Sequence, residues 1–282
     1  MARSYKRITM SLDREVLKSL ENYANDRKIN SLSAAAENIL RKGLGVGKVR
    51  QAVIMAGGQA KRLRPFTYEF PKPLMPLQGK AIIEHSFALL KKYGVEEVII
   101  ALGYLADKMK EALGDGSRYG LKFIYVEEKS PLGTAGSLIL AKKYLTGPFF
   151  LVWADVLIDI DLDDLAHYHR QNRAIGTMAL ATVDDITDLG VIELQGGLIK
   201  KFIEKPDPKN TTSHLINAGL VLFELSVFDF LPKRVKAVSI EREVYPQIVA
   251  KNKLAGYPFQ GAWFDTGTPD RYERALKKWH IK

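Results

Sequence analysis

Three features are absent from this sequence of 282 residues, and each absence excludes a class of protein. There is no cysteine, so neither a disulfide framework nor a thiolate zinc site can form. No apolar run approaches the roughly 20 residues that a membrane-spanning helix needs, and the first residues show no apolar stretch typical of a secretory signal. The sequence therefore predicts a protein without disulfides or a membrane partner, suited to a reducing cytoplasm.

An excess of acidic residues is also lacking. The chain has 42 Lys and Arg against 32 Asp and Glu, which gives a formal net charge of +10. The first 50 residues carry eleven of these cations and five of the acids, a local charge of +6. Such a basic segment is able to bind a polyanion, or it is simply a solvated surface. The 46% hydrophobic and 26% charged residues are otherwise typical of a globular protein of one or two domains.

The glycine-punctuated stretch LGVGK separates two sequence patterns and predicts a boundary between domains 1–46 and 47–282. Before it, YKRITMSL alternates apolar and polar residues, which is typical of a strand. Two amphipathic helices are predicted to follow, the first with Asp13 as its N-cap. Because one strand cannot form a stable sheet, we expect it to pair with the same strand of a second copy.

This unit of a strand and two helices, residues 6–45, closely resembles the ribbon-helix-helix family of dimeric DNA-binding domains. The resemblance implies a homodimer joined through an antiparallel ribbon, and leaves open whether dimers associate further. It also implies that Arg7, Thr9 and Ser11 enter the major groove of DNA, where Arg can contact guanine and Thr or Ser either base edge. Leu32 stands where the family often has a polar or basic residue, so a module that only dimerises is the alternative.

After the glycine joint, short apolar runs alternate with amphipathic stretches. RQAVIMAGG, VEEVIIALG, LKFIYVEE and PFFLVWADVL read as strands, with helical patterns between them, and hairpin-like patterns begin near residue 175. This alternation predicts an α/β fold, a Rossmann-like domain with a mixed, mainly parallel sheet and helices on both faces. Ligands in such sheets bind at the carboxyl ends of the strands, where the two glycines of AGG and the acid of VWAD are expected to lie.

The segment AGGQAKRLRPFT…PKPLMPL resembles the signature loop of the sugar-nucleotide pyrophosphorylases, the nucleoside-triphosphate sugar-1-phosphate nucleotidyltransferases. The motifs PLGTAGSL, WADVLIDIDL, FIEKP, INAGLVLF and WFDTGTPDRY follow in the family's order, so the resemblance runs over residues 51–272. Several stretches are most similar to mannose-1-phosphate guanylyltransferase-like members. The resemblance thus implies GTP and mannose 1-phosphate as substrates, with glucose 1-phosphate and a uridine or thymidine triphosphate as the alternative within the class.

Each motif has a physical task in nucleotidyl transfer between two anionic reactants. Gly57 and Gly58 allow backbone N–H groups to approach a triphosphate without a Cβ in the way. The resemblance gives Arg62 and Lys72 the role of stabilising phosphate charge, one as a fork and the other as a point charge. It places the nucleotide on Ala56, Gly57, Gly58, Lys61, Leu132, Gly133 and Thr134. It places the sugar phosphate on Gly190, Glu204, Lys205 and Asn217.

Two acids complete the site that the resemblance implies. Asp155 ends an apolar strand and Asp265 lies in WFDTG, at the places where the family holds Mg²⁺. One or two carboxylates together with substrate phosphates are a normal ligand set for this hard cation.

Three positions depart from the family's pattern. Ala60 stands for a glycine and Lys61 for a Ser or Thr, so a left-handed backbone at position 60 would cost about 1–2 kcal/mol. Trp153 precedes Asp155 where small residues are usual, and we expect it to point into the core. These departures also support a second hypothesis, a DNA-binding regulator whose large domain only senses a nucleotide or sugar nucleotide. Retention of the charged residues favours the enzyme.

Overall fold

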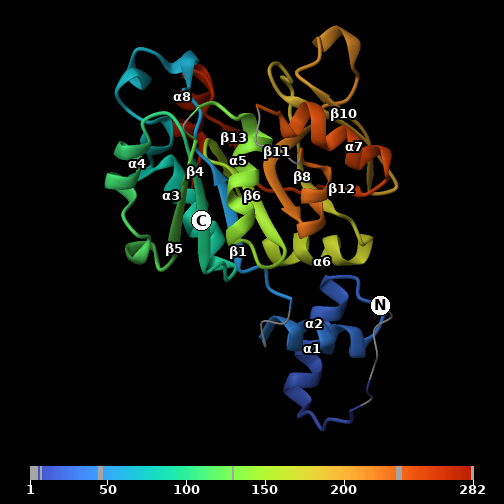
Figure 1. Cartoon of the computed structure of the whole chain (residues 1–282). Helices are drawn as coiled ribbons and strands as arrows, with labels where there is room; N and C mark the ends of the chain where they lie inside the picture. Colours follow the sequence, from blue (N-terminus) through green and yellow to red (C-terminus); the bar gives the residue numbers. More distant parts are fainter. Residues whose placement is uncertain (1–5, 7, 44–46, 129, 233–236, 281–282) are drawn as a thin grey trace. The chain divides into compact units, whose positions relative to one another are not determined.

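The computed structural model describes residues 6, 8–43, 47–128, 130–232 and 237–280, apart from the side chains of residues 41 and 42. The chain forms two compact units, Met1–Lys48 and Val49–Lys282 (Figure 1). The predicted boundary after residue 46 falls at the edge of a segment outside the described residues. None of the helices in the described part is long and apolar enough to cross a membrane.

The first unit consists of two helices, α1 (Arg14–Asp26) and α2 (Leu32–Gly43). Asp13 caps α1 as predicted, since its carboxylate accepts a hydrogen bond from the Val16 amide at 2.9 Å. Residues 8–12 have no regular secondary structure, so the strand expected there is not formed in the single chain. Arg7, one of the expected DNA contacts, lies outside the described residues.

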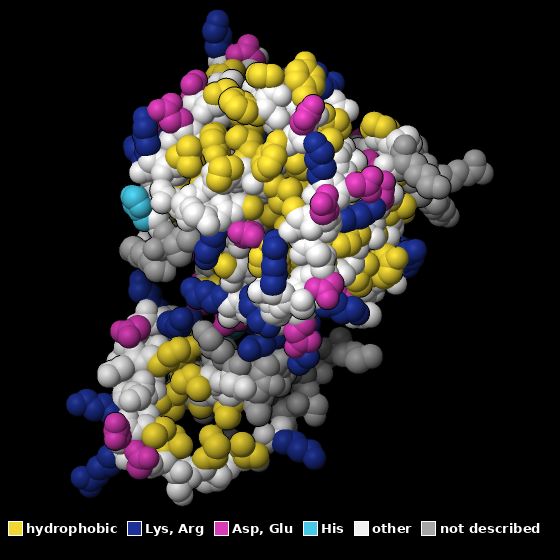
Figure 2. All heavy atoms as spheres, turned by 90° about the vertical axis from the view of Figure 1, so that its left-hand side faces the viewer, with side chains coloured by type: hydrophobic (Ala, Val, Ile, Leu, Met, Phe, Trp, Pro, Cys, Tyr) yellow, Lys and Arg dark blue, Asp and Glu magenta, His cyan; other side chains and the backbone are white. Residues whose placement is uncertain are grey.

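This small unit leaves much of its apolar surface in solvent. Its buried core consists of Leu20, Ala24 and Ala35. Of the twelve large hydrophobic residues that are exposed in the described part of the chain, eight belong to this unit: Ile8, Met10, Leu12, Val16, Leu17, Leu32, Ile39 and Leu40. Figure 2 shows hydrophobic side chains on the surface of this unit with Lys and Arg side chains around them. The unit therefore presents an apolar surface that its own residues do not cover.

The second unit is built on a nine-stranded sheet in the order β5-β4-β1-β6-β11-β8-β12-β10-β9. Its strands are β1 (Gln51–Met55), β4 (Glu97–Leu102), β5 (Lys122–Glu127), β6 (Phe149–Trp153), β8 (Gly176–Thr182), β9 (Gly190–Gln195), β10 (Leu198–Glu204), β11 (Leu215–Phe223) and β12 (Leu254–Pro258). Two small pairs accompany it, β2 (Pro76–Leu77) with β3 (Lys80–Ala81), and β7 (Val156–Ile158) with β13 (Trp263–Asp265).

The sheet is mixed, as expected, but it is not mainly parallel. Pairs among β5, β4, β1 and β6 are parallel, as is β8 with β12, whereas β6–β11, β11–β8, β12–β10 and β10–β9 are antiparallel. The first part of the unit has helices between its strands, and such crossovers allow parallel pairing. In the later part, Gly196 and Gly197, both with positive φ, join β9 to β10 as an antiparallel hairpin.

Helices cover both faces of the sheet, which places its core in two layers. The longer ones are α3 (Ile82–Lys92), α4 (Ala106–Leu113), α5 (Gly133–Ala141), α6 (Leu162–Asn172), α7 (Tyr245–Ala250) and α8 (Pro269–Lys278). Short turns include η1 (Lys61–Leu63), η2 (Phe66–Tyr68), η3 (Lys72–Leu74), η5 (Lys142–Tyr144) and the π-helical η8 (Ile240–Val244). One layer contains residues of α3, α4 and α6, and the other residues of α5, α7 and η8. The carboxyl ends of β1, β4 and β6 are left open at one edge.

Candidate active site

A cavity of about 760 Å³ lies at the carboxyl ends of β1 and β6. Its walls are the loop after β1, the segment that begins α5, and residues 153–155 after β6. Nine of the residues expected to form the site line it: Ala56, Gly57, Gly58, Lys61, Arg62, Lys72, Gly133, Thr134 and Asp155. The sheet thus brings together a glycine turn, three cations and a carboxylate that are up to 99 positions apart in the sequence.

The two glycines of the loop have different physical roles. A Cβ at Gly57 would lie 3.3 Å from the Gly103 amide nitrogen, so the tight approach of two loops favours glycine there. A Cβ at Gly58 would meet nothing within 4 Å, and the residue is exposed. Packing within the protein therefore explains Gly57, whereas Gly58 leaves its backbone open to a ligand.

Ala60 has the left-handed backbone that was considered from the sequence, with φ of 46° and ψ of 47°. Its carbonyl accepts hydrogen bonds from the Thr67 hydroxyl at 2.9 Å and from the Leu63 amide at 3.0 Å. These two contacts hold a conformation that costs an alanine about 1–2 kcal/mol. They direct the chain into η1, which carries Lys61 and Arg62.

Lys72 and Asp155 form an ion pair at the centre of the cavity, with Nζ and Oδ2 2.6 Å apart. Lys72 is buried, whereas the Asp155 side chain is 38% exposed and faces the cavity. Burial disfavours the charged carboxylate, but the Lys72 ammonium and its hydrogen bond outweigh this, so the pKa of Asp155 lies below its usual value. Asp155 is therefore an anion that a buried cation holds in place.

Asp265 lies on the strand next to Asp155. It pairs in register with Val156, and the Thr266 hydroxyl donates to the Asp155 carbonyl at 2.8 Å. Its carboxylate is bonded to Arg271 at 2.6 Å and to the Gly267 amide at 2.7 Å. Asp155 thus lies in the turn before β7 and Asp265 at the end of the adjacent β13, and each is already paired with one basic side chain.

Arg62 is bonded to an acid that the sequence did not point to. Its Nη1 lies 2.6 Å from Oδ2 of Asp188, in the loop between β8 and β9, and both side chains are 47% exposed. A Cβ at Gly267 would lie 2.7 Å from Nη2 of Arg62, so the guanidinium lies beside the turn after Asp265. Arg62 also contributes to the low pKa of Asp155, which places its charge close to that carboxylate.

A further part of the cavity wall is formed by the start of α5. A Cβ at Gly133, where φ is +70°, would lie 2.5 Å from the Val238 carbonyl, so only glycine fits. The Thr134 hydroxyl donates to Glu241 at 2.7 Å and accepts from the Ile240 amide at 2.8 Å. Thr134 therefore uses its hydroxyl to fasten this turn to η8, although it lines the cavity.

A second missed residue, Glu128, lines the cavity as well. Its carboxylate accepts a hydrogen bond from the Leu132 amide at 2.7 Å and another from the Ser137 hydroxyl. Leu132 itself does not line the cavity, but its amide orients this acid. No motif indicated Glu128, but its place directly after β5, at the carboxyl end of a strand, was a signal in the sequence.

Residues expected at the sugar phosphate gather on the antiparallel strands. Gly190 pairs with Glu204 across β9 and β10, and a Cβ at Gly190 would lie 3.1 Å from the Glu204 carboxylate. Lys205 follows with φ of +50° and holds its Nζ 4.0 Å from Glu204. Burial, and then the negative charge of Glu241, raise the pKa of Glu204. Asn217, on β11, accepts from the Gly219 amide at 3.0 Å.

Trp153 both packs against the core and lines the cavity, whereas the sequence predicted only the first contact. Its side chain is partly buried and packs against the core layer that contains α5. It also lines the cavity next to Asp155. The contact with the core was therefore expected, whereas Trp153 also lines the cavity.

Comparison with known proteins settles the family. The sequence profile described as nucleotidyl transferase matches residues 51–280, which is most of the chain. The chain belongs to the nucleotidyl transferase family. It is 36% identical over 225 residues to mannose-1-phosphate guanyltransferase beta-A of Xenopus laevis, covering 78% of this chain and 61% of that protein. It is 38% identical over 229 residues to the catalytic subunit beta of the Drosophila pseudoobscura enzyme, covering 79% and 61%.

Solved structures agree on the nucleotidyl transferase fold. A putative glucose-1-phosphate thymidylyltransferase from Bacillus anthracis superposes with a TM-score of 0.74 at 23% identity, covering 82% of this chain and 97% of that one. HddC from Yersinia pseudotuberculosis gives 0.70 at 23% identity, covering 82% and 99%. At this identity the likeness shows the fold alone. The chain spans about 61% of the length of the curated relatives named above.

The nucleotidyl transferase site offers oxygen ligands of the kind that Mg²⁺ prefers. No group of three or more His, Asp or Glu side chains gathers to hold a metal within the described ranges. Asp155 and Asp265 would thus supply at most two carboxylates, and phosphate oxygens and water the rest. The chemistry of these donors suits Mg²⁺, since each acid keeps lone pairs beyond those used by Lys72 and Arg271, although only Asp155 of the two lines this cavity.

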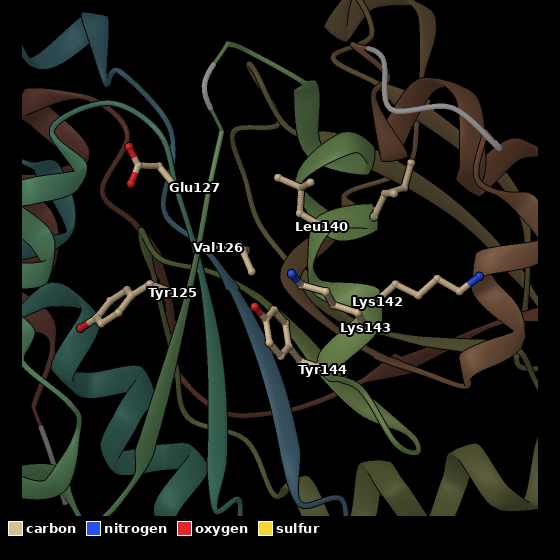
Figure 3. A pocket seen from close by; sticks show the side chains of 8 residues that line it. Tyr125, Val126, Glu127, Leu140, Lys142, Lys143 and Tyr144 are labelled. Carbon is tan, nitrogen blue, oxygen red and sulfur yellow. The ribbon is translucent and has the colours of Figure 1, made fainter.

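A second cavity, of about 710 Å³, lies away from these residues along the edge strand β5 (Figure 3). Tyr125, Val126 and Glu127 line it on one side, and Leu140, Lys142, Lys143 and Tyr144 on the other. None of the residues expected to form the site is among those that line it. The chemistry is therefore assigned to the first cavity.

Proposed function

We propose that the chain transfers a nucleotidyl group to a sugar 1-phosphate and releases pyrophosphate, with GTP and mannose 1-phosphate as its substrates. The observation that carries this proposal is the convergence of Gly58, Lys61, Arg62, Lys72 and Asp155 in one cavity at the carboxyl ends of β1 and β6. An open backbone turn with three cations suits a polyphosphate. The curated relatives, named as mannose-1-phosphate guanylyltransferases, support the choice of substrates.

In this reaction an oxygen of the sugar 1-phosphate attacks the α-phosphorus of the triphosphate. A new P–O bond forms as the bond to the bridging oxygen of the β-phosphate breaks, and the electron pair leaves with pyrophosphate. Arg62 and Lys72 neutralise charge on the phosphates, and the fixed Lys72–Asp155 pair needs little reorganisation. A Mg²⁺ ion held by Asp155 and Asp265 would supply further neutralisation of the phosphate oxygens.

Selection of guanine is assigned to Glu128. Guanine carries two neighbouring donors, N1–H and N2–H₂, that a carboxylate can accept together, whereas uracil and thymine present a single ring N–H between two carbonyls. The Glu128 carboxylate lines the cavity, where a Cβ at Gly57 would lie 3.5 Å from its Oε1, and Leu132 and Ser137 fix its orientation. A good bidentate contact of this kind is worth about 1–3 kcal/mol of discrimination.

The sugar phosphate is assigned to the antiparallel strands. Glu204 accepts hydrogen bonds from sugar hydroxyls and Lys205 binds the phosphate, a division that suits their chemistry. The absence of a side chain at Gly190 leaves room for the Phe202 ring and the Glu204 carboxylate, which lies 3.1 Å from where a Cβ would be. Asn217 contributes a further polar contact from β11.

The experiment that tests the proposal is a pyrophosphate-release assay on the full chain with Mg²⁺. Each nucleoside triphosphate is supplied in turn with mannose 1-phosphate or glucose 1-phosphate. We expect the highest kcat/KM for GTP with mannose 1-phosphate, and a loss of about tenfold to hundredfold for GTP in Glu128→Gln. Turnover with a uridine or thymidine triphosphate and glucose 1-phosphate instead would move the assignment within the class, and no turnover with any pair would refute the activity.

For the small unit we propose a homodimer formed through residues 8–12 and the two helices. The exposed side chains of Ile8, Met10 and Leu12, 70%, 48% and 43% exposed, support this. Their spacing puts them on one side of an extended segment, so a second copy would cover them together. A dimer that pairs again into a larger assembly is the further possibility, and sedimentation of the full chain measures both.

A second function, DNA binding by this dimer, rests on its charge. Arg7, Thr9 and Ser11 alternate with the apolar residues, and the first 50 residues carry a charge of +6. If the chain binds DNA, its affinity will fall steeply with salt concentration, because bound cations displace counterions. A DNA affinity that does not change when Arg7 is replaced by Gln would exclude the ribbon as the contact surface.

A further inference from the structure

The loop between β8 and β9 places a carboxylate where the proposed function requires an anion from the substrate. Asp188 is bonded to Arg62 at 2.6 Å, and its charge also acts on Glu204 at the sugar end, where it is one of the charges that raise the pKa of that acid. Asp188 therefore lies between the cation expected to bind the triphosphate and the residues expected to bind the sugar phosphate.

The backbone of this loop is fixed, so the Asp188 side chain is the part that can move. Ile186 is buried in the core, and the Thr187 amide donates to the Asp185 carboxylate at 2.9 Å. The Thr187 carbonyl accepts from Arg271 at 2.6 Å, and the Lys205 amide donates to the Leu189 carbonyl at 3.1 Å. Contacts on both sides of Asp188 thus hold the chain, while its own side chain remains 47% exposed.

The backbone conformation of Asp188 is part of this arrangement. Its φ of +61° is left-handed, which Asp tolerates better than most residues, and it directs the side chain toward Arg62. Residues held in this region at a binding site often serve the site rather than the fold.

We propose that Asp188 is an internal counter-ion that Arg62 exchanges for the triphosphate and takes back when pyrophosphate leaves. The inference rests on the proposed function and adds to it a residue that sets the affinity of the phosphate end. Without a ligand, the carboxylate neutralises the guanidinium and keeps it beside Gly267. A polyphosphate displaces it by rotation of the Asp188 side chain, because several negative charges compete with one.

The expected change in ligand affinity follows from the solvent exposure of the Arg62–Asp188 ion pair. An ion pair with both partners half-exposed contributes about 0.2–1 kcal/mol, so a ligand that has to break it loses up to about fivefold in affinity. Salt screens such a pair, and the loss therefore shrinks as ionic strength rises. Removal of the Asp188 carboxylate therefore strengthens the binding of pyrophosphate and slows its release.

The test is the affinity of inorganic pyrophosphate with Mg²⁺ for the full chain at low ionic strength, measured by calorimetry. We expect Asp188→Asn to bind about two- to fivefold more tightly than the unchanged chain. Asn accepts the left-handed backbone, and Asp188→Gly, which also accepts it, is the second variant. Asp184→Asn is the matched control, because this exposed acid of the same loop is not paired with Arg62, and it should leave the affinity unchanged.

The same two affinities are compared in a chain that carries Arg62→Gln. This distinguishes displacement of Asp188 from Arg62 from a general repulsion between the Asp188 carboxylate and pyrophosphate. We expect Asp188→Asn to have no effect there, since the pair is already absent. Unchanged or weaker pyrophosphate binding in both Asp188 variants, or equal strengthening with and without Arg62, would overturn the inference. No pyrophosphate binding by any variant would overturn it together with the proposed function, whereas the expected pattern without turnover of any substrate pair would refute the proposed function alone.

Discussion

The two units of this chain differ in how far their hydrophobic residues are buried. In the small unit three residues, Leu20, Ala24 and Ala35, are buried around one contact between helices, while Ile8 and Met10 remain in solvent. In the nucleotidyl transferase unit every residue of β4 after Glu97 is buried, and two core layers fill both faces of the sheet. The large unit buries an extensive core of its own, whereas the small one leaves most of its large apolar side chains exposed.

Size explains the difference. A segment of about 40 residues rarely buries enough surface to be stable alone, and association is one of the few remedies open to it without disulfides or metal. A unit of more than 200 residues has no such need. We therefore propose that the small unit is responsible for association and the large unit for the chemistry. Each substitution described next changes one unit and leaves the other as it is.

The largest expected effect is on chemistry alone. Asp155→Asn removes the negative charge that Lys72 holds in the cavity, and we expect kcat/KM to fall by about 10²–10³-fold, as for loss of one fixed electrostatic group. Steady-state pyrophosphate release measures it, and sedimentation should show unchanged association. Asp159→Asn, an exposed acid nearby in the sequence, is the control; activity of Asp155→Asn within about threefold of that control would remove Asp155 from the machinery.

The next largest effect is expected on the proposed dimer of the small unit and not on the chemistry. Met10→Lys places a charge on the uncovered apolar surface, and we expect the dissociation constant of the dimer to rise by at least about 30-fold. Thr9→Lys adds the same charge on the other side of an extended segment and should leave the dimer intact. Analytical ultracentrifugation distinguishes the two, and a monomeric unchanged chain would contradict the assignment.

A smaller effect concerns the dependence of stability on pH in the large unit. Burial, and then Glu241, raise the pKa of Glu204 above its ordinary 4.5, so the folded chain binds this proton more tightly than the unfolded chain. The free energy of unfolding of the unchanged chain, relative to Glu204→Gln, should therefore fall as pH rises from 4.5 through the raised pKa. Urea titrations across this range measure it. A difference that rises with pH for Glu204 would contradict the assigned direction of its pKa shift.

The smallest effect is a gain in stability at the phosphate loop. Ala60→Gly relieves a left-handed alanine, and after the entropy cost of glycine we expect about 0.5–1 kcal/mol of stabilisation, or a few degrees in Tm. Calorimetry measures the shift, with activity retained. Ala262→Gly, an exposed alanine that is not left-handed, should lower Tm slightly; an equal drop in both variants would show that Ala60 is not strained.

Local patterns predicted the parts whose residues are close in sequence. The glycine turn after β1, the strands up to β6 and the Asp13 cap follow from adjacent residues, and the structure has them. Motif order was enough to identify the family. The balance of parallel and antiparallel strands was misjudged, because pairing depends on connections between distant strands rather than on the strand sequences.

Two acids of the proposed mechanism were not indicated by any motif, and Arg271 lies in the motif WFDTGTPDRY, which gave it no role. Glu128 is oriented by Leu132 and Ser137 once α5 packs on β5. Asp188 contacts Arg62 across 126 positions, and Arg271 joins Asp265 to the same loop. An acid or a base in a loop is common, and only its neighbours in space give it a role.

By itself, the sequence determined the α/β class of the large unit, the glycine and cation chemistry of its phosphate loop, and an apolar segment that its own unit leaves uncovered. The periodicity of hydrophobic residues and the conformational freedom of glycine are local properties, so adjacent residues carry them. The tertiary structure alone decided which acid meets which base: Lys72 with Asp155, Arg271 with Asp265, and Arg62 with Asp188. Electrostatic energy depends on distance and burial, and both arise only when the strands that carry these charges come together.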